Sequence, residues 1–194
     1  MRIERKTFLA ISIVLISVCL SGSAWTDQGE TTIRWDLISA DAQGNLKAGG
    51  QDSAADSLNS ILTLTGSGTF EPGEAEEVTG GGTWTLGTSS GKYQVTSLVR
   101  FTLAPCTVPT CVSGFGGTDL VGNEKDARAG LVVLRIKYSD GDSGVLMVSC
   151  NLNGTPLSVF EGIIASKGSV TFWNQAPNAA NNATIFHILL REEH

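Results

Sequence analysis

The stretch from Gly130 to Leu152, GLVVLRIKYSDGDSGVLMVSCNL, decides the fold. In its first half, apolar side chains recur at every second position, from Val132 to Tyr138. A period of two is typical of a half-buried strand, because successive side chains point to opposite faces. The two halves are joined by SDGDSG, and Asp-Gly is a strong hairpin signal. The stretch therefore predicts two long antiparallel strands joined by a tight turn.

The same alternation continues on both sides of this hairpin. Tyr93–Ala104 alternates in the same way, and six shorter segments also have strand character: TTIRWDLIS, SILTLTGSGTF, GGTWTL, SVFEGIIAS, SVTFWN and ATIFHILL. Polar linkers rich in Gly, Asn and Pro separate them, and no window after the first 24 residues predicts an amphipathic helix. We expect an all-β fold, a single antiparallel β-barrel of about eight strands, with a β-sandwich as the alternative.

The segment from Gly66 to Leu86, GSGTFEPGEAEEVTGGGTWTL, sets clusters of glycine beside Phe70 and Trp84. Glycine inside strand-like sequence marks a bend, a bulge or the close approach of another backbone. We predict that these glycines let the strands coil tightly while the two aromatic side chains fill the interior. A phosphate-binding loop would need a lysine and a following helix, and the segment has neither.

The N-terminus has the three parts of a secretory signal peptide: basic residues, the apolar run Phe8–Leu20, and then small residues. The run is thirteen residues long, whereas a membrane-spanning helix needs about 20. We expect a signal peptide at 1–24, an N-terminal strand and flexible loop at 25–57, and the barrel at 58–194, the last two forming one domain. The predicted location is secreted or periplasmic, with no membrane span.

The formal net charge is −6, with 13 basic and 19 acidic residues. Lysine and arginine are scattered singly along the sequence, so no basic stripe is visible and we expect no nucleic-acid partner. No cofactor motif is present either, and none is predicted.

Four cysteines are present, of which Cys19 lies in the predicted signal peptide. Cys106 and Cys111 flank a short proline-containing loop, and we expect them to form a disulfide in an oxidising compartment. Cys150 lies in an apolar run and is predicted to be a buried free thiol. The cysteines lack the paired close spacing of a zinc site, so no metal is predicted.

Several segments resemble a family of small secreted bacterial proteins of unknown role: LTGSGTFEPG, VTGGGTWTL, VTSLVRFTLAP, ARAGLVVLRIKYSDGDSGVLMVSCNLNGTP and VFEGIIASKGSVTFWN. This resemblance covers most of residues 60 to 190 and implies no activity. More loosely, the alternation of glycine turns and aromatic strands is similar to the allene oxide cyclase and dirigent group of eight-stranded barrels. That likeness would imply a cavity for an apolar or phenolic ligand.

Three ionisable residues lie inside strong strand patterns and are the candidate catalytic groups: Arg135, Glu161 and His187. A buried carboxylate beside a cation can transfer protons, and histidine titrates near neutrality. The competing interpretation is that they form ion pairs or face solvent on outward strand faces. Gly141–Val145, GDSGV, resembles the nucleophile segment of chymotrypsin-like proteases, but turn chemistry explains its residues without catalysis.

Four aromatic residues are candidates to line an apolar ligand site: Trp84, Tyr93, Phe101 and Trp173. Phe172 and Trp173 are neighbours on a predicted strand, so at most one of them can face the interior. Together these features predict an exported binding or structural module for a small apolar ligand or an extracellular component. The alternatives are a cyclase or isomerase of the allene oxide cyclase type and a self-associating surface protein.

Overall fold

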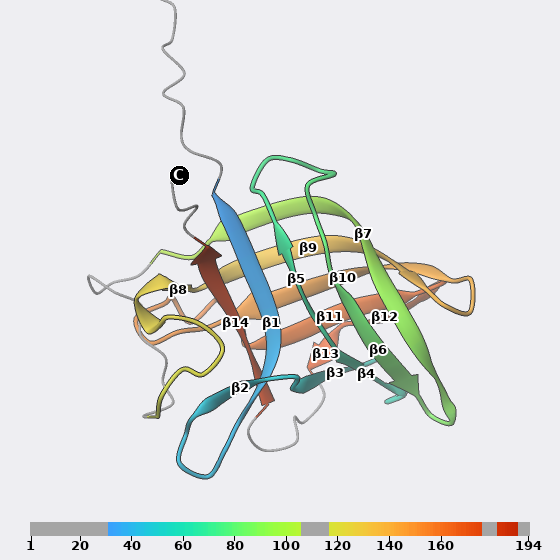
Figure 1. Cartoon of the computed structure of the whole chain (residues 1–194). Coiled ribbons are helices and arrows are strands. Elements are labelled where there is room, and N and C mark those ends of the chain that lie inside the picture. Colours follow the sequence, from blue (N-terminus) through green and yellow to red (C-terminus); the bar gives the residue numbers. More distant parts are fainter. Residues whose placement is uncertain (1–30, 106–116, 176–181, 190–194) are drawn as a thin grey trace, which may run out of the picture.

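The computed structural model describes residues 31–105, 117–175 and 182–189, and these are almost entirely β-structure (Figure 1). The one helical element in these ranges is the short 3₁₀ turn η1, Glu124–Asp126. Within the same ranges, no helix has the length and apolarity to cross a membrane. The strands are β1 Thr32–Ala40, β2 Leu46–Ala48, β3 Gln51–Ala55, β4 Ile61–Thr65, β5 Ser67–Phe70, β6 Gly81–Leu86, β7 Ser89–Leu103, β8 Ala127–Arg128, β9 Gly130–Tyr138, β10 Ser143–Cys150, β11 Gly162–Lys167, β12 Val170–Phe172, β13 Asn174–Gln175 and β14 Asn182–Leu189.

All fourteen strands belong to one sheet, and every ladder between named strands is antiparallel. The main strand order is β12-β11-β10-β9-β7-β6-β5-β1-β14-β8, with β2 paired to β1, and β3 joined to both β4 and β13. The all-β prediction is therefore confirmed. The order does not return to its start, so the sheet is not closed, and the choice between a barrel and a sandwich stays a prediction.

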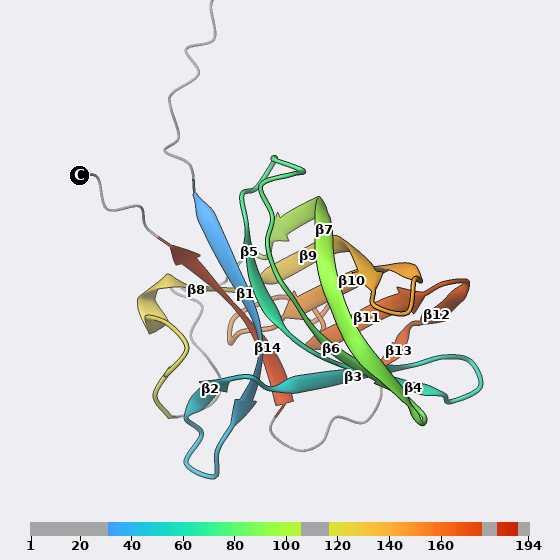
Figure 2. The ribbon, with the colours of Figure 1, turned by 45° about the vertical axis from the view of Figure 1, so that its right-hand side comes forward.

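The sheet curls over on itself to enclose the core. In Figures 1 and 2, strands β14, β1, β5 and β6 lie in front of β9, β10 and β11 and cross them at a steep angle. Strand β7 passes from one layer to the other, and its pairing with β9 shifts register between Val95 and Ser97 and again between Leu98 and Arg100. Such bulges bend a strand and increase its twist, which lets one strand form the corner between two layers.

The predicted hairpin from Gly130 to Leu152 is confirmed. β9 and β10 pair from Ser143–Lys137 to Cys150–Gly130, and the turn between them places Gly141 at a φ of 102°. Along β9 the side chains alternate between buried and more exposed as the sequence predicts, with Leu134 and Ile136 in the core. The period-two pattern therefore sets which face of this strand points inward.

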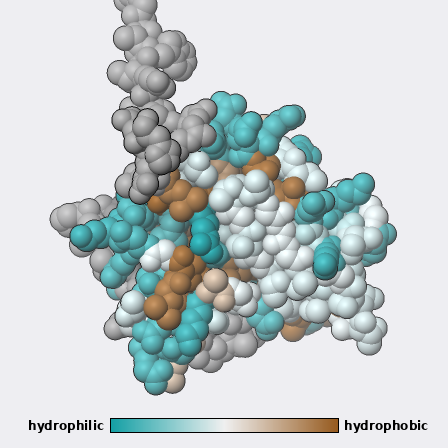
Figure 3. Space-filling view, in the orientation of Figure 1, coloured by the Kyte–Doolittle hydropathy of each residue, from teal (hydrophilic) through white to brown (hydrophobic). Residues whose placement is uncertain are grey.

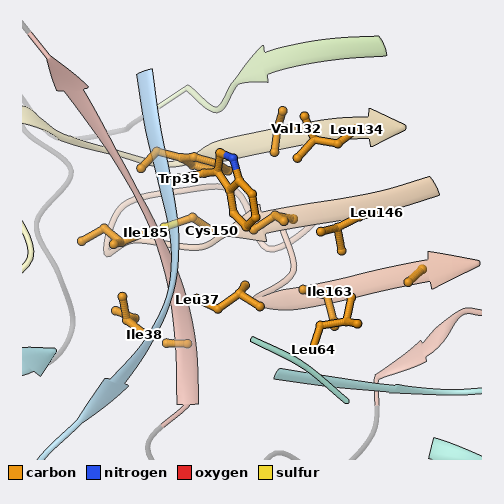
Figure 4. Packing of buried hydrophobic residues seen from close by; sticks show 14 of the residues in the cluster. Trp35, Leu37, Ile38, Leu64, Val132, Leu134, Leu146, Cys150, Ile163 and Ile185 are labelled. Atoms are coloured by element: carbon orange, nitrogen blue, oxygen red, sulfur yellow. The ribbon is translucent and has the colours of Figure 1, made fainter. Parts of the chain in front are cut away.

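Buried side chains lie on both faces of β1 and β14. Figure 4 shows Leu37 beside Ile163 and Leu64 between the layers, whereas Ile38 and Ile185 lie on the other side of the two strands. The second face is covered by β2 and by the segment 117–128. This segment is attached through the Leu46 amide, which donates to the Thr118 carbonyl at 2.9 Å, and through β8, which pairs with β14.

The glycines around β6 occupy positions where a side chain would collide with a neighbouring strand. A Cβ at Gly82 would lie 1.9 Å from the Thr65 carbonyl oxygen, and one at Gly81 would lie 2.4 Å from that of Tyr93. Phe70 and Trp84 are both buried in the core. The structure therefore agrees with the prediction that glycines permit close strand approach while the aromatic residues fill the interior.

Three segments differ from the sequence prediction. The expected strand SILTLTGSGTF is divided at Gly66 into β4, which pairs with β3 and β6, and β5, which pairs with β1 and β6. β11 begins only at Gly162, because the preceding residues form turns. The expected flexible loop of the N-terminal region contains β2 and β3, whose small and polar residues give little strand signal but gain partners from the rest of the sheet.

Replacing Gly82 with alanine is expected to lower the free energy of unfolding by about 2–3 kcal/mol, because the new methyl group would force β4 and β6 apart. Urea denaturation measures the change. Thr85→Ala, on the same strand and exposed, is the control and is expected to change stability by less than about 0.5 kcal/mol. Equal effects of the two substitutions would contradict the steric role of Gly82.

Candidate functional site

The core contains a cluster of aromatic side chains, in the kind of apolar interior where a ligand could bind. The ring centroids of Phe70 and Phe101 lie 5.0 Å apart, and that of Phe186 lies 5.6 Å from Phe101. These separations are those of rings in direct contact. Trp35, on β1, is fully buried in the same core. Side chains of the protein itself therefore occupy this part of the interior.

Lys167, on β11, is a buried cation next to aromatic side chains of the core. Its Nζ lies 4.6 Å from the centroid of Trp84 and 4.9 Å from that of Tyr138, and it pairs with Asp140 and Asp142 of the β9–β10 turn. Burial alone would lower the pKa of Lys167, but the bonds to the two carboxylates outweigh burial and raise it. The bond to Lys167 in turn lowers the pKa of Asp140. These contacts attach the end of β11 to the β9–β10 turn, which explains Asp142 of GDSGV, and Asp140 just before that segment, as structural residues.

Glu161 lies where β14 approaches β10 and β11 without a backbone ladder between them. Its carboxylate accepts hydrogen bonds from the amide of Asn151 at 2.6 Å and from the amide of Thr184 at 2.5 Å. The Thr184 hydroxyl donates to the Ser149 carbonyl at 2.7 Å, and its oxygen lies 3.0 Å from Oε1 of Glu161. Side-chain bonds therefore connect strands that the main order of the sheet places far apart. We refer to Ser149, Glu161 and Thr184 as the seam.

Burial raises the pKa of Glu161 to about 7, and the negative charge of Asp52 adds to the effect, although the bonds from Asn151 and Thr184 act in the opposite direction. Asp52 is almost fully buried on β3. Burial also raises the pKa of Cys150 well above its ordinary value, so this thiol is a poor nucleophile at neutral pH. Cys150 is free and fully buried, as predicted.

His187 lies on the face of β14 that the 117–128 segment covers. Its Nε2 is 2.7 Å from Oδ2 of Asp119, and both side chains are almost completely buried. The second oxygen of Asp119 accepts from the amides of Val121 and Gly122. Gly122 lies against the imidazole ring, where a Cβ would be 2.6 Å from Cδ2. The pair therefore fixes the covering segment to the sheet.

The three candidate catalytic residues do not share a site. Arg135 is exposed on the outer face of β9, Glu161 belongs to the seam, and His187 lies beneath the 117–128 segment on the opposite side of β14 from Thr184. Proton transfer between two of them would require hydrogen-bond distance or one bridging water. Any catalytic role for them stays a prediction, and the arrangement does not bring them to one substrate.

The predicted ligand-binding aromatic residues are divided between the core and the surface. Trp84 and Tyr93 are buried, and the Tyr93 hydroxyl donates to the Thr65 carbonyl at 2.9 Å. Phe101 packs against the core, and Trp173 is 56% exposed. Phe172, by contrast, is buried, which confirms that these two neighbours point to opposite faces.

A groove of about 880 Å³ lies on the outer surface where β6, β7 and β9 are adjacent. Gly81 pairs with Gln94, and Gln94 pairs in turn with Lys137, so three neighbouring strands meet here. Gly81 and Gln94 both line this hollow. Figure 3 shows a broad surface of neutral hydropathy on the face where β5, β6 and β7 lie in front.

Exposed polar side chains border this groove: Thr83, Lys92, Gln94, Lys137 and Ser139. Lys92 lies next to Ser139, the residue that follows β9, since the Lys92 amide donates to Ser139 Oγ at 3.0 Å. Lys92 and Lys137 form no ion pair with any described residue. We refer to this hollow as the outer groove, and its volume falls in the range of small-ligand sites, about 300–1,000 Å³.

Of the four predicted ligand-binding aromatic residues, Tyr93 is among the residues that line the outer groove. The exposed polar residues that border it were not predicted. The available signal was indirect: Lys137 alternates with the core residues of β9, and the three consecutive glycines lie in a strand. The glycines lie beside Gln94 and Lys137 only because β6, β7 and β9 are neighbours. This pairing cannot be predicted from either segment alone.

The disulfide and the metal site considered in the sequence analysis concern different parts of the chain. The expected Cys106–Cys111 disulfide lies outside them. Among the residues that the structure describes, no group of three or more His, Cys, Asp or Glu side chains is arranged to hold a metal ion.

No family model, curated protein or solved structure matches the chain. The resemblance to small secreted bacterial proteins and to the allene oxide cyclase and dirigent barrels therefore stays a prediction. The roles of the outer groove and the seam are therefore inferred from their geometry.

Glu161 is expected to make the protein less stable as pH rises from 4.5 to about 7. In this window the folded protein holds a proton that the unfolded chain releases, so the free energy of unfolding falls by on the order of 3 kcal/mol and then levels off. Glu161→Gln is expected to abolish this decrease in the free energy of unfolding with pH. Glutamine has one side-chain oxygen instead of two, so one of the two backbone N–H groups loses its acceptor. Chemical denaturation at several pH values measures the difference. Glu76→Gln, at an exposed position, should keep the wild-type dependence, and an unchanged slope in Glu161→Gln would contradict the assignment.

Asp119→Ala is expected to lower the free energy of unfolding by about 2–3 kcal/mol, because it leaves the buried Nε2 of His187 and the amides of Val121 and Gly122 without their acceptor. Hydrogen exchange should also accelerate at the Val121 and Gly122 amides. Glu124→Ala, exposed on the same segment, is expected to change stability by less than about 0.5 kcal/mol. Unaltered exchange in Asp119→Ala would show that the pair does not hold the segment.

Proposed function

We propose that the protein is an exported binding module that holds an external ligand on its surface, in the outer groove. The observation that carries this proposal is the groove itself: a hollow of about 880 Å³ bordered by exposed polar side chains. Binding sites combine a concave surface with a few polar groups that fix the orientation of the ligand. Export is inferred from the N-terminal sequence pattern alone.

The geometry favours a surface site over the predicted interior site for an apolar or phenolic molecule. The aromatic rings of Phe70, Phe101 and Phe186 pack against one another, and those of Trp84, Tyr93 and Tyr138 do the same. An interior ligand would have to displace these contacts. A ligand in the outer groove needs no such rearrangement, because its border is already exposed.

The groove is also rigidly held. β7 pairs with β6 on one side and with β9 on the other along the whole groove, and the Ser139 amide donates to the Lys92 carbonyl at 2.8 Å. A site on paired strands keeps its polar groups in place, which lowers the entropic cost of binding. The outer groove therefore has the preorganisation that a recognition surface needs.

Thr83→Trp is expected to block the groove and to abolish ligand binding while leaving the fold intact, because the position is exposed. Amide chemical-shift changes in nuclear magnetic resonance spectra are the measurement, with cellohexaose, polygalacturonate oligomers and palmitate as probes. Wild-type shifts should centre on Gly80–Gly82, Lys92–Gln94 and Lys137–Gly141.

Thr85→Trp is the matched control, since Thr85 faces outward two residues along the same strand but does not border the groove. It should bind as the wild type does. Shifts centred on Phe70, Phe101 and Phe186 with palmitate would instead support the interior site and overturn the proposal, as would equal binding by Thr83→Trp and Thr85→Trp.

A further inference from the structure

The curl of the sheet gathers cations that are scattered along the sequence. Lys92 and Arg100 lie on the outer face of β7, and Arg135 and Lys137 lie on the outer face of β9, which pairs with it. All four are exposed, and none forms an ion pair with a described residue. Lysine and arginine are scattered singly along the sequence, but four of them are gathered on this face of the sheet. We refer to these four residues as the basic face.

The nearest described carboxylates of the β9–β10 turn do not neutralise the groove end of this face. Asp140 and Asp142 both bind Lys167, whose ammonium lies among the core rings of Trp84 and Tyr138. The cations bordering the outer groove, Lys92 and Lys137, therefore remain available to a ligand. At the other end of the face, Arg100 adjoins the glutamate-rich 71–77 loop, which is attached to β7 where the Leu98 amide donates to the Ala75 carbonyl at 2.8 Å.

Resting on the proposed function, we infer that the ligand of the outer groove is an acidic polysaccharide whose carboxylates pair with the basic face. Lys92 and Lys137 border the groove, and Arg135 lies two residues further along β9 on the same face. A strand advances about 3.3 Å per residue, so the eight steps from Lys92 to Arg100 extend over at most roughly 26 Å, because the two bulges of β7 shorten and bend the strand. Several separated cations on paired strands are suited to the repeated carboxylates of a polymer rather than to a single small anion.

The neutral part of the surface favours a sugar chain over other polyanions. Between the cations lie side chains that both donate and accept hydrogen bonds, among them Gln94, Thr96 and Ser139, and these match sugar hydroxyls. Single-stranded nucleic acids are held by aromatic side chains that stack on bases. In the described residues, no aromatic side chain on this face is exposed, since Tyr93, Tyr138 and Trp84 are buried. Four cations are also few against the charge density of a nucleic acid.

The experiment measures binding of polygalacturonate oligomers by calorimetry at low and moderate salt. The wild-type protein is expected to bind, and affinity should fall with salt because charge pairs are screened. Lys92→Gln with Lys137→Gln is expected to weaken binding about tenfold, and Arg135→Gln should weaken it further. Lys47→Gln with Lys125→Gln removes the same charge from exposed positions elsewhere and is expected to bind within about twofold of the wild type.

Two further probes separate the failure of this inference from that of the proposed function. Equal binding of the neutral methyl ester of polygalacturonate, or tighter binding of oligothymidylate, would overturn the inference that the ligand is an acidic polysaccharide. The outer groove would still be the binding site if Thr83→Trp blocked binding of these probes. Equal loss in the two double variants would place binding outside the groove and would overturn both. Failure of the wild-type protein to bind polygalacturonate at low salt would overturn this inference alone.

Discussion

The close approach of backbones at Gly80, Gly81 and Gly82 is the constraint on which the rest of the structure depends. β6 has β4 and β5 on one side and β7 on the other, and any side chain at these glycines would meet a neighbouring carbonyl oxygen or Cα. The absence of Cβ atoms lets the sheet curl tightly enough for β14, β1, β5 and β6 to cover β9, β10 and β11. The candidate binding groove lies along the same strands, with these three glycines in its lining. The close approach of the strands and the position of the groove are therefore features of one part of the sheet.

The curled sheet is completed by side chains rather than by a backbone ladder. At the seam, Thr184 connects β14 to Ser149 and Glu161, and elsewhere Lys167 connects β11 to the β9–β10 turn. Both connections bury ionisable groups, and buried polar groups are tolerated only where hydrogen bonds satisfy them. The interior is therefore sensitive to the protonation of one carboxylate, that of Glu161.

The sequence predicts most of the strands because their signal is local. In Gly130–Leu152 the alternation and the Asp-Gly turn are sufficient, and both strands and the inward face follow correctly. β2 and β3 could not be predicted, since their small and polar residues become strands only by pairing with β1 and β4. The outer groove and the basic face also depend on pairing: Lys92 and Lys137 are 45 residues apart in the chain, and only the β7–β9 ladder makes them neighbours. The division of the 61–70 segment at Gly66 likewise follows from a change of partner strand.

The main strand order ends in β12 and β8, which contain three and two residues. An open sheet can aggregate through its edge strands, because their unpaired backbone N–H and C=O groups can bind a strand of another chain. Here each margin offers only a few such groups before the chain turns away. The molecule can thus leave its sheet unclosed and still resist the edge-to-edge addition of further copies.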